Sequence, residues 1–81
     1  MKAKIFIKYK EGILDPQGTV TNKALKSIDI KGINSIGIGK YVEMEFESNI
    51  TKEIANSIAE DSCKKMLANP NTETYKFIIE E

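Results

Sequence analysis

The sequence lacks histidine and tryptophan and contains a single cysteine, Cys63. Without histidine there is no Ser-His or Cys-His pair, no His-ligated metal site, and no side chain whose unperturbed pKa lies near neutrality. One cysteine cannot form an internal disulfide, so we expect Cys63 to be a reduced thiol packed as a small hydrophobe, as suits the cytosol. These absences argue against a self-sufficient enzyme.

The chain also lacks an excess of charge, because 12 basic residues balance 12 acidic ones. A net charge of zero argues against a general nucleic-acid binder, which normally shows a basic excess. No run approaches the ~20 apolar residues of a membrane span. Lysines at alternate positions interrupt the short apolar stretch at the N-terminus, which does not read as a signal peptide. We therefore expect a cytoplasmic protein with no membrane or nucleic-acid partner.

The length of 81 residues is suited to one domain, spanning 1–81. A domain of this size buries only about 60% of the surface of its unfolded chain. Such a core is marginal unless tight packing or a partner subunit supports it. The sequence therefore predicts a small binding or assembly module.

Three stretches show the alternation of apolar and polar residues that is typical of strands, at 3–9, 36–46 and 74–80. The middle stretch is longer than a typical strand. It predicts either two strands or one sharply kinked strand, with Gly37–Lys40 as a β-turn or bulge.

Two helical stripes lie between these strands. Asp15 and Pro16 are suited to the N-cap and first position of a helix that carries an apolar stripe and ends by Gly32. Thr51 is suited to cap a second helix, which Asn69 and Pro70 would stop. The predicted order is β-α-β-β-α-β. The predicted fold is a two-layer α+β sandwich, with two helices on one face of an antiparallel sheet.

The predicted outer face of this sheet, opposite the helices, carries a lysine row on the first strand and glutamates in the middle segment. Cross-strand ion pairs would account for both rows, each contributing a few tenths of a kcal/mol. Phe6, Tyr41 and Ile78 share this face. They are either scattered exposed residues or a self-association surface. The weak core favours a homodimer or homotetramer, formed through this face or through an edge strand.

No catalytic constellation can be assembled from the chain. Residues 37–40 are glycine-rich with a lysine, but they lack the spacing of a phosphate loop. Glu43, Glu45 and Glu47 are two residues apart on a strand, so they form a charged face and not a converging acid/base pair or a metal site. We predict no catalytic and no metal-binding residues.

The alternation of apolar and polar residues does not account for the residues of two short motifs. They are residues 12–18, followed by Ala24-Leu25, and residues 63–70, followed by Glu73 and Tyr75. In combination, and with the pair Gly39-Lys40 between them, they resemble the PurS family, the small subunit of phosphoribosylformylglycinamidine synthase. Gly37 stands where that family usually has arginine, and residues 71, 72 and 74 also depart from its usual pattern.

The resemblance implies a ferredoxin-like, PurS-like fold and an accessory role in the fourth step of de novo purine biosynthesis. In that step a glutaminase subunit releases ammonia, and a larger ATP-dependent synthetase subunit uses it to form the amidine. The family's small subunit has no active site and no cofactor, since ATP and magnesium belong to the synthetase. It forms a dimer, or a pair of dimers, that helps to hold the two enzymes together.

Polar, conformationally constrained segments that the core pattern does not explain are the candidate contacts with these partners. They are Asp15, Pro16, Gln17, Gly18, Lys40, Asn69, Pro70, Glu73 and Tyr75. Ordinary turn chemistry is the alternative, because Asp-Pro can cap a helix and Asn-Pro can end one.

Two other functions remain open at this point. Domains of the same topology often bind small ligands at subunit edges, which would make this chain a regulatory module. An RNA-binding sheet of the same topology would need exposed aromatic residues on its central strands, for which Phe6 and Tyr41 are the candidates.

Overall fold

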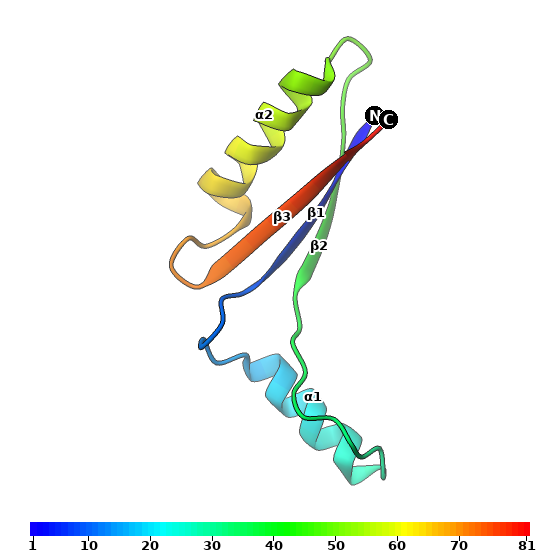
Figure 1. Ribbon diagram of the computed structural model, residues 1–81, viewed down its shortest axis with the longest axis vertical. Coiled ribbons are helices and arrows are strands. Elements are labelled where there is room, and N and C mark those ends of the chain that lie inside the picture. The colour runs from blue at the N-terminus through cyan, green and yellow to red at the C-terminus, as the bar shows by residue number, and fades with distance from the viewer.

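The computed structural model describes all residues from 1 to 81. A three-stranded antiparallel sheet has the order β2-β1-β3 (Figure 1). Its strands are β1 (Lys2–Tyr9), β2 (Lys40–Glu45) and β3 (Glu73–Glu80). The helices are α1 (Pro16–Ser27) and α2 (Lys52–Ser62), and α2 continues into a π-helical turn, η1 (Cys63–Leu67). The predicted α+β class with an antiparallel sheet is confirmed. No helix has the length and apolar character needed to cross a membrane.

The core lies between the inner face of the sheet and α2, which packs on β1 and β3. The central strand contributes Ala3, Ile5 and Ile7, while α2 and its continuation contribute mainly small residues. Ala55 and Ala59 are fully buried, and such small side chains let the helix approach the sheet closely. Cys63 is also buried, as predicted, and this burial raises the pKa of its thiol.

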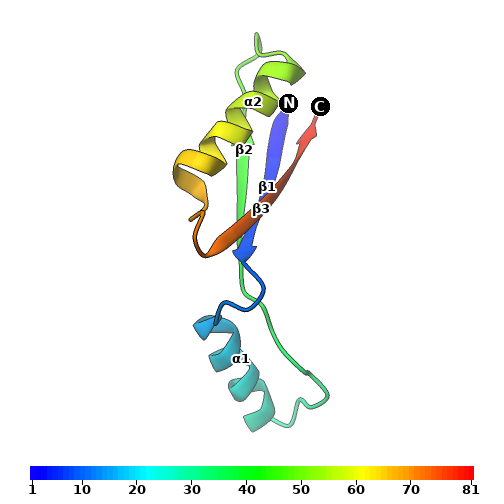
Figure 2. The ribbon, with the colours of Figure 1, turned by 60° about the vertical axis from the view of Figure 1, so that its left-hand side comes forward.

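The first helix does not take the predicted place on the face of the sheet. It projects beyond the end of β1, so the molecule measures 51 × 25 × 14 Å (Figures 1 and 2). Residues 10–39 form an α1 arm, and residues 1–9 and 40–81 form a sheet body. Within the α1 arm Gly18 is the only buried residue. The apolar stripe of α1 is therefore uncovered, and Val20 and Ile28 are each 66% exposed.

The predicted fourth strand is absent, because only Lys40–Glu45 of the middle stretch pairs with the sheet. Residues 37–39 form neither a turn nor a bulge. The segment before β2 passes close to α1, where a Cβ atom at Gly18 would overlap the carbonyl oxygen of Ile36. At the other end of this segment, a Cβ atom at Gly39 would overlap the carbonyl oxygen of Ile7. Close backbone approach, and not a turn, explains these two glycines.

The isolated chain exposes an unusual amount of surface. Its accessible area is 6143 Å², whereas a compact monomer of this mass would expose about 4,900 Å². The radius of gyration is 16.2 Å, against about 12 Å for a compact domain of this length. The separate α1 arm accounts for this shape (Figure 1).

Candidate partner-binding site

Asp15 fixes the start of the α1 arm. Its carboxylate accepts hydrogen bonds from the backbone N–H of Gly18 at 2.9 Å and of Ile38 at 2.7 Å. The bond from Ile38, and then that from Gly18, lowers the pKa of Asp15. Pro16 is the first helical residue, as predicted, and Gln17 after it is exposed. The capping role of Asp15 is confirmed, and a partner contact at residues 15–18 stays a prediction.

Several polar contacts hold the loop before β3. The Glu73 carboxylate accepts from the backbone N–H of Asn69 at 2.8 Å and lies 3.7 Å from the ammonium of Lys40. The ammonium of Lys10 donates to the carbonyl oxygen of Pro70 at 2.6 Å. The side chain of Glu73 is only 14% exposed. The structure thus brings Lys40 together with the loop of residues 69–73.

Tyr75 makes an internal contact. Its hydroxyl group bonds to the carboxylate of Glu60 at 3.0 Å, which ties β3 to α2. Partial burial first, and this bond second, raise the pKa of Tyr75. The hydroxyl group of Tyr75 therefore stabilises the sheet body itself.

Most of the predicted contact residues gather where the sheet body meets the α1 arm. The backbone N–H of Lys10 donates to the carbonyl oxygen of Thr72 at 2.9 Å, so the loop of residues 69–73 lies beside the start of the arm. We call this region the junction, formed by residues 10–15, 37–40 and 69–73. Sequence reasoning missed Lys10, because no local pattern indicates a contact with a residue 60 positions away.

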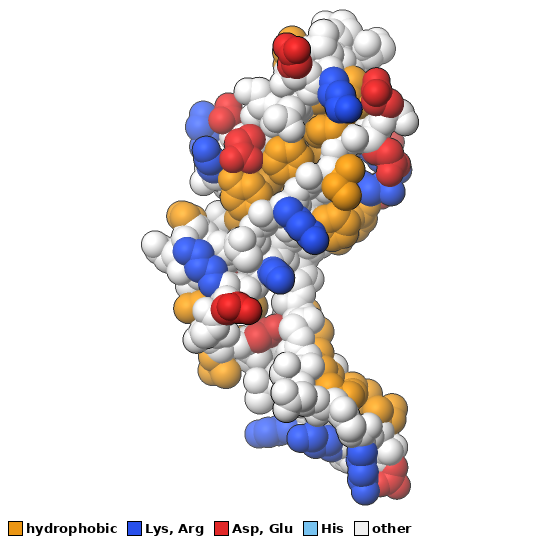
Figure 3. Space-filling view, in the orientation of Figure 1, with side chains coloured by type: hydrophobic (Ala, Val, Ile, Leu, Met, Phe, Trp, Pro, Cys, Tyr) orange, Lys and Arg blue, Asp and Glu red, His pale blue; other side chains and the backbone are white.

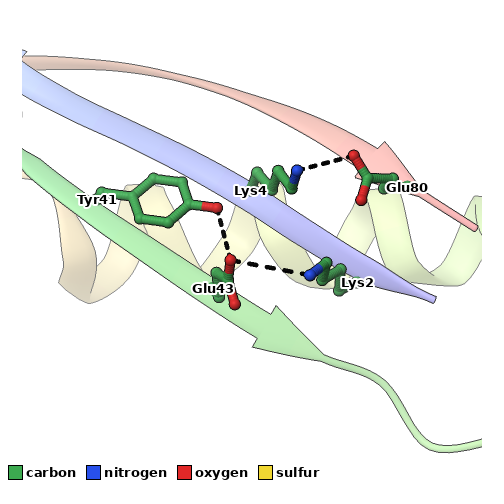
Figure 4. Close-up of polar contacts among 5 residues, drawn as sticks. All are labelled: Lys2, Lys4, Tyr41, Glu43 and Glu80. Atoms are coloured by element: carbon green, nitrogen blue, oxygen red, sulfur yellow. Dashed lines mark hydrogen bonds and ion pairs between the residues drawn. The ribbon is translucent and has the colours of Figure 1, made fainter.

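The outer face of the sheet carries cross-strand ion pairs, of which one joins a first-strand lysine to the middle segment as predicted. Lys2 lies 3.9 Å from Glu43 on β2, whereas Lys4 turns to Glu80 on β3 at 2.9 Å (Figure 4). The hydrogen bond between Lys4 and Glu80 raises the pKa of the lysine and lowers that of the carboxyl group. The Tyr41 hydroxyl donates to Glu43 at 2.8 Å.

A hollow of about 760 Å³ lies on the same face, toward the junction. The rings of Phe6 and Tyr41 form part of its lining, with their centroids 5.2 Å apart and their planes tilted by 41°. Ile78 lies beside them, and the three side chains are 39%, 50% and 57% exposed in this order. Their exposure agrees with the self-association surface that the sequence predicts, but that role stays a prediction.

Three carboxylates of the candidate site and its surroundings form hydrogen bonds within the chain. The carboxylates of Asp15, Glu60 and Glu73 each accept from an N–H or hydroxyl group of the chain itself. No group of three or more Cys, Asp or Glu side chains is placed to hold a metal ion. What the site offers chemically is surface, charge and backbone groups near the junction.

Comparisons with known proteins cover the whole length of the chain. Residues 2–81 match the family model PurS, described as phosphoribosylformylglycinamidine (FGAM) synthase. The PurS subunit of this synthase from Archaeoglobus fulgidus is 35% identical over 81 residues, which is 100% of both chains. The subunit from Bacillus subtilis is 34% identical over 80 residues, covering 99% of this chain and 93% of the relative.

Solved structures of similar proteins share the fold. PurS from Methanocaldococcus jannaschii superposes with a TM-score of 0.86 at 31% identity, over 99% of this chain and 95% of that chain. A chain in the structure of PurLQS from Thermotoga maritima gives 0.69 at 28% identity, over 95% and 93%. Sequence, length and architecture agree, and the chain belongs to the PurS family.

Proposed function

We propose that the chain is the non-catalytic bridging subunit of the phosphoribosylformylglycinamidine synthase complex of de novo purine biosynthesis, in the cytoplasm. It helps the glutaminase and the ATP-dependent synthetase subunits to assemble for ammonia transfer. The observation that carries the proposal is the match to PurS subunits along the entire chain. The likeness to a chain of a PurLQS structure supports the role in assembly.

A bridging part has a physical purpose in such a reaction. Free ammonia in water is protonated, and ammonium is not a nucleophile. Two active sites that exchange ammonia must therefore be docked and closed to solvent while the transfer takes place. A bridging protein stabilises the docked state by adding contact area. The junction supplies polar groups for this contact, and ATP and magnesium would act in the synthetase.

The proposal includes a homodimer, for which the exposed surface is the main support. The isolated chain exposes about 1,200 Å² more than a compact monomer of its mass. A standard protein–protein interface buries about 800 Å² on each partner. An excess of this size is what a chain would expose if part of its core were completed by a second copy.

The two uncovered apolar surfaces suggest how the copies meet. Val42 and Met44 of β2, and Phe46 directly after it, pack against the core but remain only half-buried, because α2 packs on β1 and β3. Hydrophobic side chains also line one side of the α1 arm, in the lower part of Figure 3. In the proposed dimer, α1 of each copy covers the inner face of β2 in the other. A reciprocal exchange of this kind fits the two-fold symmetry of most dimers.

The decisive experiment mixes purified glutaminase and synthetase subunits with and without this protein. We expect glutamine-dependent formation of the amidine, and a ternary complex in sedimentation, only when the protein is present. An ammonium salt in place of glutamine is the matched control, because the synthetase then needs no transfer and should respond little. If glutamine-dependent activity and assembly are both indifferent to the protein, the proposal fails.

A further inference from the structure

We propose that the hollow on the outer sheet face receives an acidic segment of a partner enzyme. Several residues of that segment would occupy the hollow, with an apolar side chain against Phe6, Tyr41 and Ile78. Neighbouring carboxylates would face Lys8 and Lys76. The inference rests on the proposed function, because it names the chemistry by which one of the two enzymes is recognised.

The hollow has an apolar floor. Phe6 faces Tyr41 directly across the β1–β2 pair, and Ile78 lies on β3 in the next row of the sheet. These are the only large hydrophobic residues that point outward from the three strands. Apolar anchors set in a pocket and surrounded by polar contacts are the usual centre of binding energy in protein interfaces.

The charges around this floor are of one sign. Lys8 and Lys76 line the hollow, and neither forms an ion pair within the chain. At the far end of the same face, Lys2 and Lys4 are neutralised by glutamates (Figure 4). The ion-paired half of the outer face thus has no excess of positive charge, since Glu45 lies there as well. The part around the hollow is positive, and a negatively charged partner complements it.

A second copy of the chain is a poorer occupant than an acidic partner. Among the outward-pointing carboxylates of the strands, Glu43 and Glu80 are already paired with lysines, which leaves Glu45 to meet two free lysines. The proposed dimer moreover uses the inner face and the α1 arm, so it leaves the outer face open. The sequence assigned Phe6, Tyr41 and Ile78 to self-association, and the charges now favour a different molecule.

The hollow is continuous with the junction. Lys40, Thr74 and Tyr75 line its edge as well. Lys40 also holds Glu73, and through it the loop of residues 69–73. A partner segment bound in the hollow would therefore contact the outer face and the junction together.

The test reverses the charge of the hollow. The double variant Lys8→Glu/Lys76→Glu is compared with Lys52→Glu/Lys65→Glu, which makes the same change in net charge at exposed positions of α2 and η1. Binding to each purified enzyme is measured by sedimentation at low and high salt. We expect the hollow variant to bind one enzyme at least tenfold more weakly at low salt, and the control to change less than twofold. Phe6→Ala should weaken the same binding at both salt concentrations.

Zero-length cross-linking with a carbodiimide identifies the occupant, since it joins amines only to carboxylates in contact. Cross-links from Lys8 or Lys76 to one enzyme support the inference. Cross-links to Glu45 of a second copy, a fall in the mass of the isolated protein on Phe6→Ala, or retardation of an RNA oligonucleotide that the hollow variant abolishes would overturn it. Equal binding by hollow and control variants also refutes it. The proposed function fails separately, if the wild-type chain binds neither enzyme.

Discussion

The sheet body and the α1 arm are built from one chain but are stabilised in different ways. The sheet body buries seven apolar residues, each at most 6% exposed. The α1 arm buries no apolar side chain and depends on the bonds of Asp15. Isolated helices shorter than about 12–15 residues are marginal in water, and α1 has 12. The comparison teaches that the sheet body contains its own core, whereas the arm leaves its apolar stripe uncovered within the chain.

The largest expected effect is on the sheet body. Ile5 is the largest apolar side chain that is fully buried, on the central strand. Ile5→Ala should lower the free energy of unfolding by about 2–5 kcal/mol, because it removes buried methylene groups and leaves a cavity. Urea denaturation measures the change. A loss below about 1 kcal/mol would mean that the body is not the stable part of the molecule.

The next largest effect is that of Val20→Ala, which tests whether a second copy covers α1. In a free helix, Val20→Ala should stabilise slightly, because alanine has the higher helix propensity. If a second copy covers α1, the same change should weaken the dimer by about 1–2 kcal/mol, because buried apolar area is lost. Thermal unfolding at several protein concentrations shows whether Val20→Ala raises or lowers the stability. A gain in stability at all concentrations would contradict the exchanged dimer.

Acid should loosen the arm through Asp15. The folded-state pKa of this residue is lowered, so its stabilising contribution is complete above the unfolded pKa of about 3.9. It is lost as the pH falls through the lower folded-state pKa. Amide exchange at Gly18 and Ile38 should accelerate in this range, relative to amides of β1. Asp15→Asn should make the arm insensitive to this titration, and an unchanged acid response in that variant would assign the effect elsewhere.

A smaller effect is expected at the junction. Lys40→Met removes the ion pair with Glu73 but keeps most of the length of the side chain. The Lys40 side chain is 60% exposed, so water screens its charge, and we expect global stability to change by about 1 kcal/mol or less. Amide exchange at Asn69, whose N–H bonds to Glu73, should nevertheless increase. Lys2→Met is the control, since it removes a pair with Glu43 at the opposite end of the sheet from this loop. Unchanged exchange at Asn69 would show that Glu73 holds the loop without Lys40.

The smallest expected effect is the change in stability when Gly37 is substituted. A Cβ atom there would meet no atom within 4 Å, and the φ angle is not positive. Gly37→Arg, which introduces the arginine that the family resemblance leads one to expect, should change stability by less than about 0.5 kcal/mol. Its effect on binding to the two enzymes, measured beside the wild type, shows whether the missing arginine matters. A large loss of stability would mean that this segment is packed more tightly than the structure shows.

Local features of the fold could be predicted from the sequence. Asp15 and Thr51 cap the two helices as their positions indicate, and β1 and β3 follow the alternation of their residues. These features depend on neighbouring residues alone, which is why the pattern was sufficient.

The place of α1 and the fate of residues 28–39 could not be predicted in this way. An apolar stripe favours a covered helix but does not indicate which surface would cover it. Parity continues from Ile36 into β2, but the part before Lys40 passes beside α1 and pairs with no strand. Contacts such as that of Lys10 with Pro70 join distant positions, and a single sequence carries no sign of them.

The separate arm has a consequence for mixed populations of the protein. If α1 of each copy packs on β2 of the other, a mutation that disrupts one α1 arm exposes the sheet of the partner copy. A copy with a defective arm and a copy with a defective β2 would then form dimers with one fully native half and one doubly impaired half. Two inactive variants could restore activity when they are unfolded and refolded together, as partial complementation within one assembly.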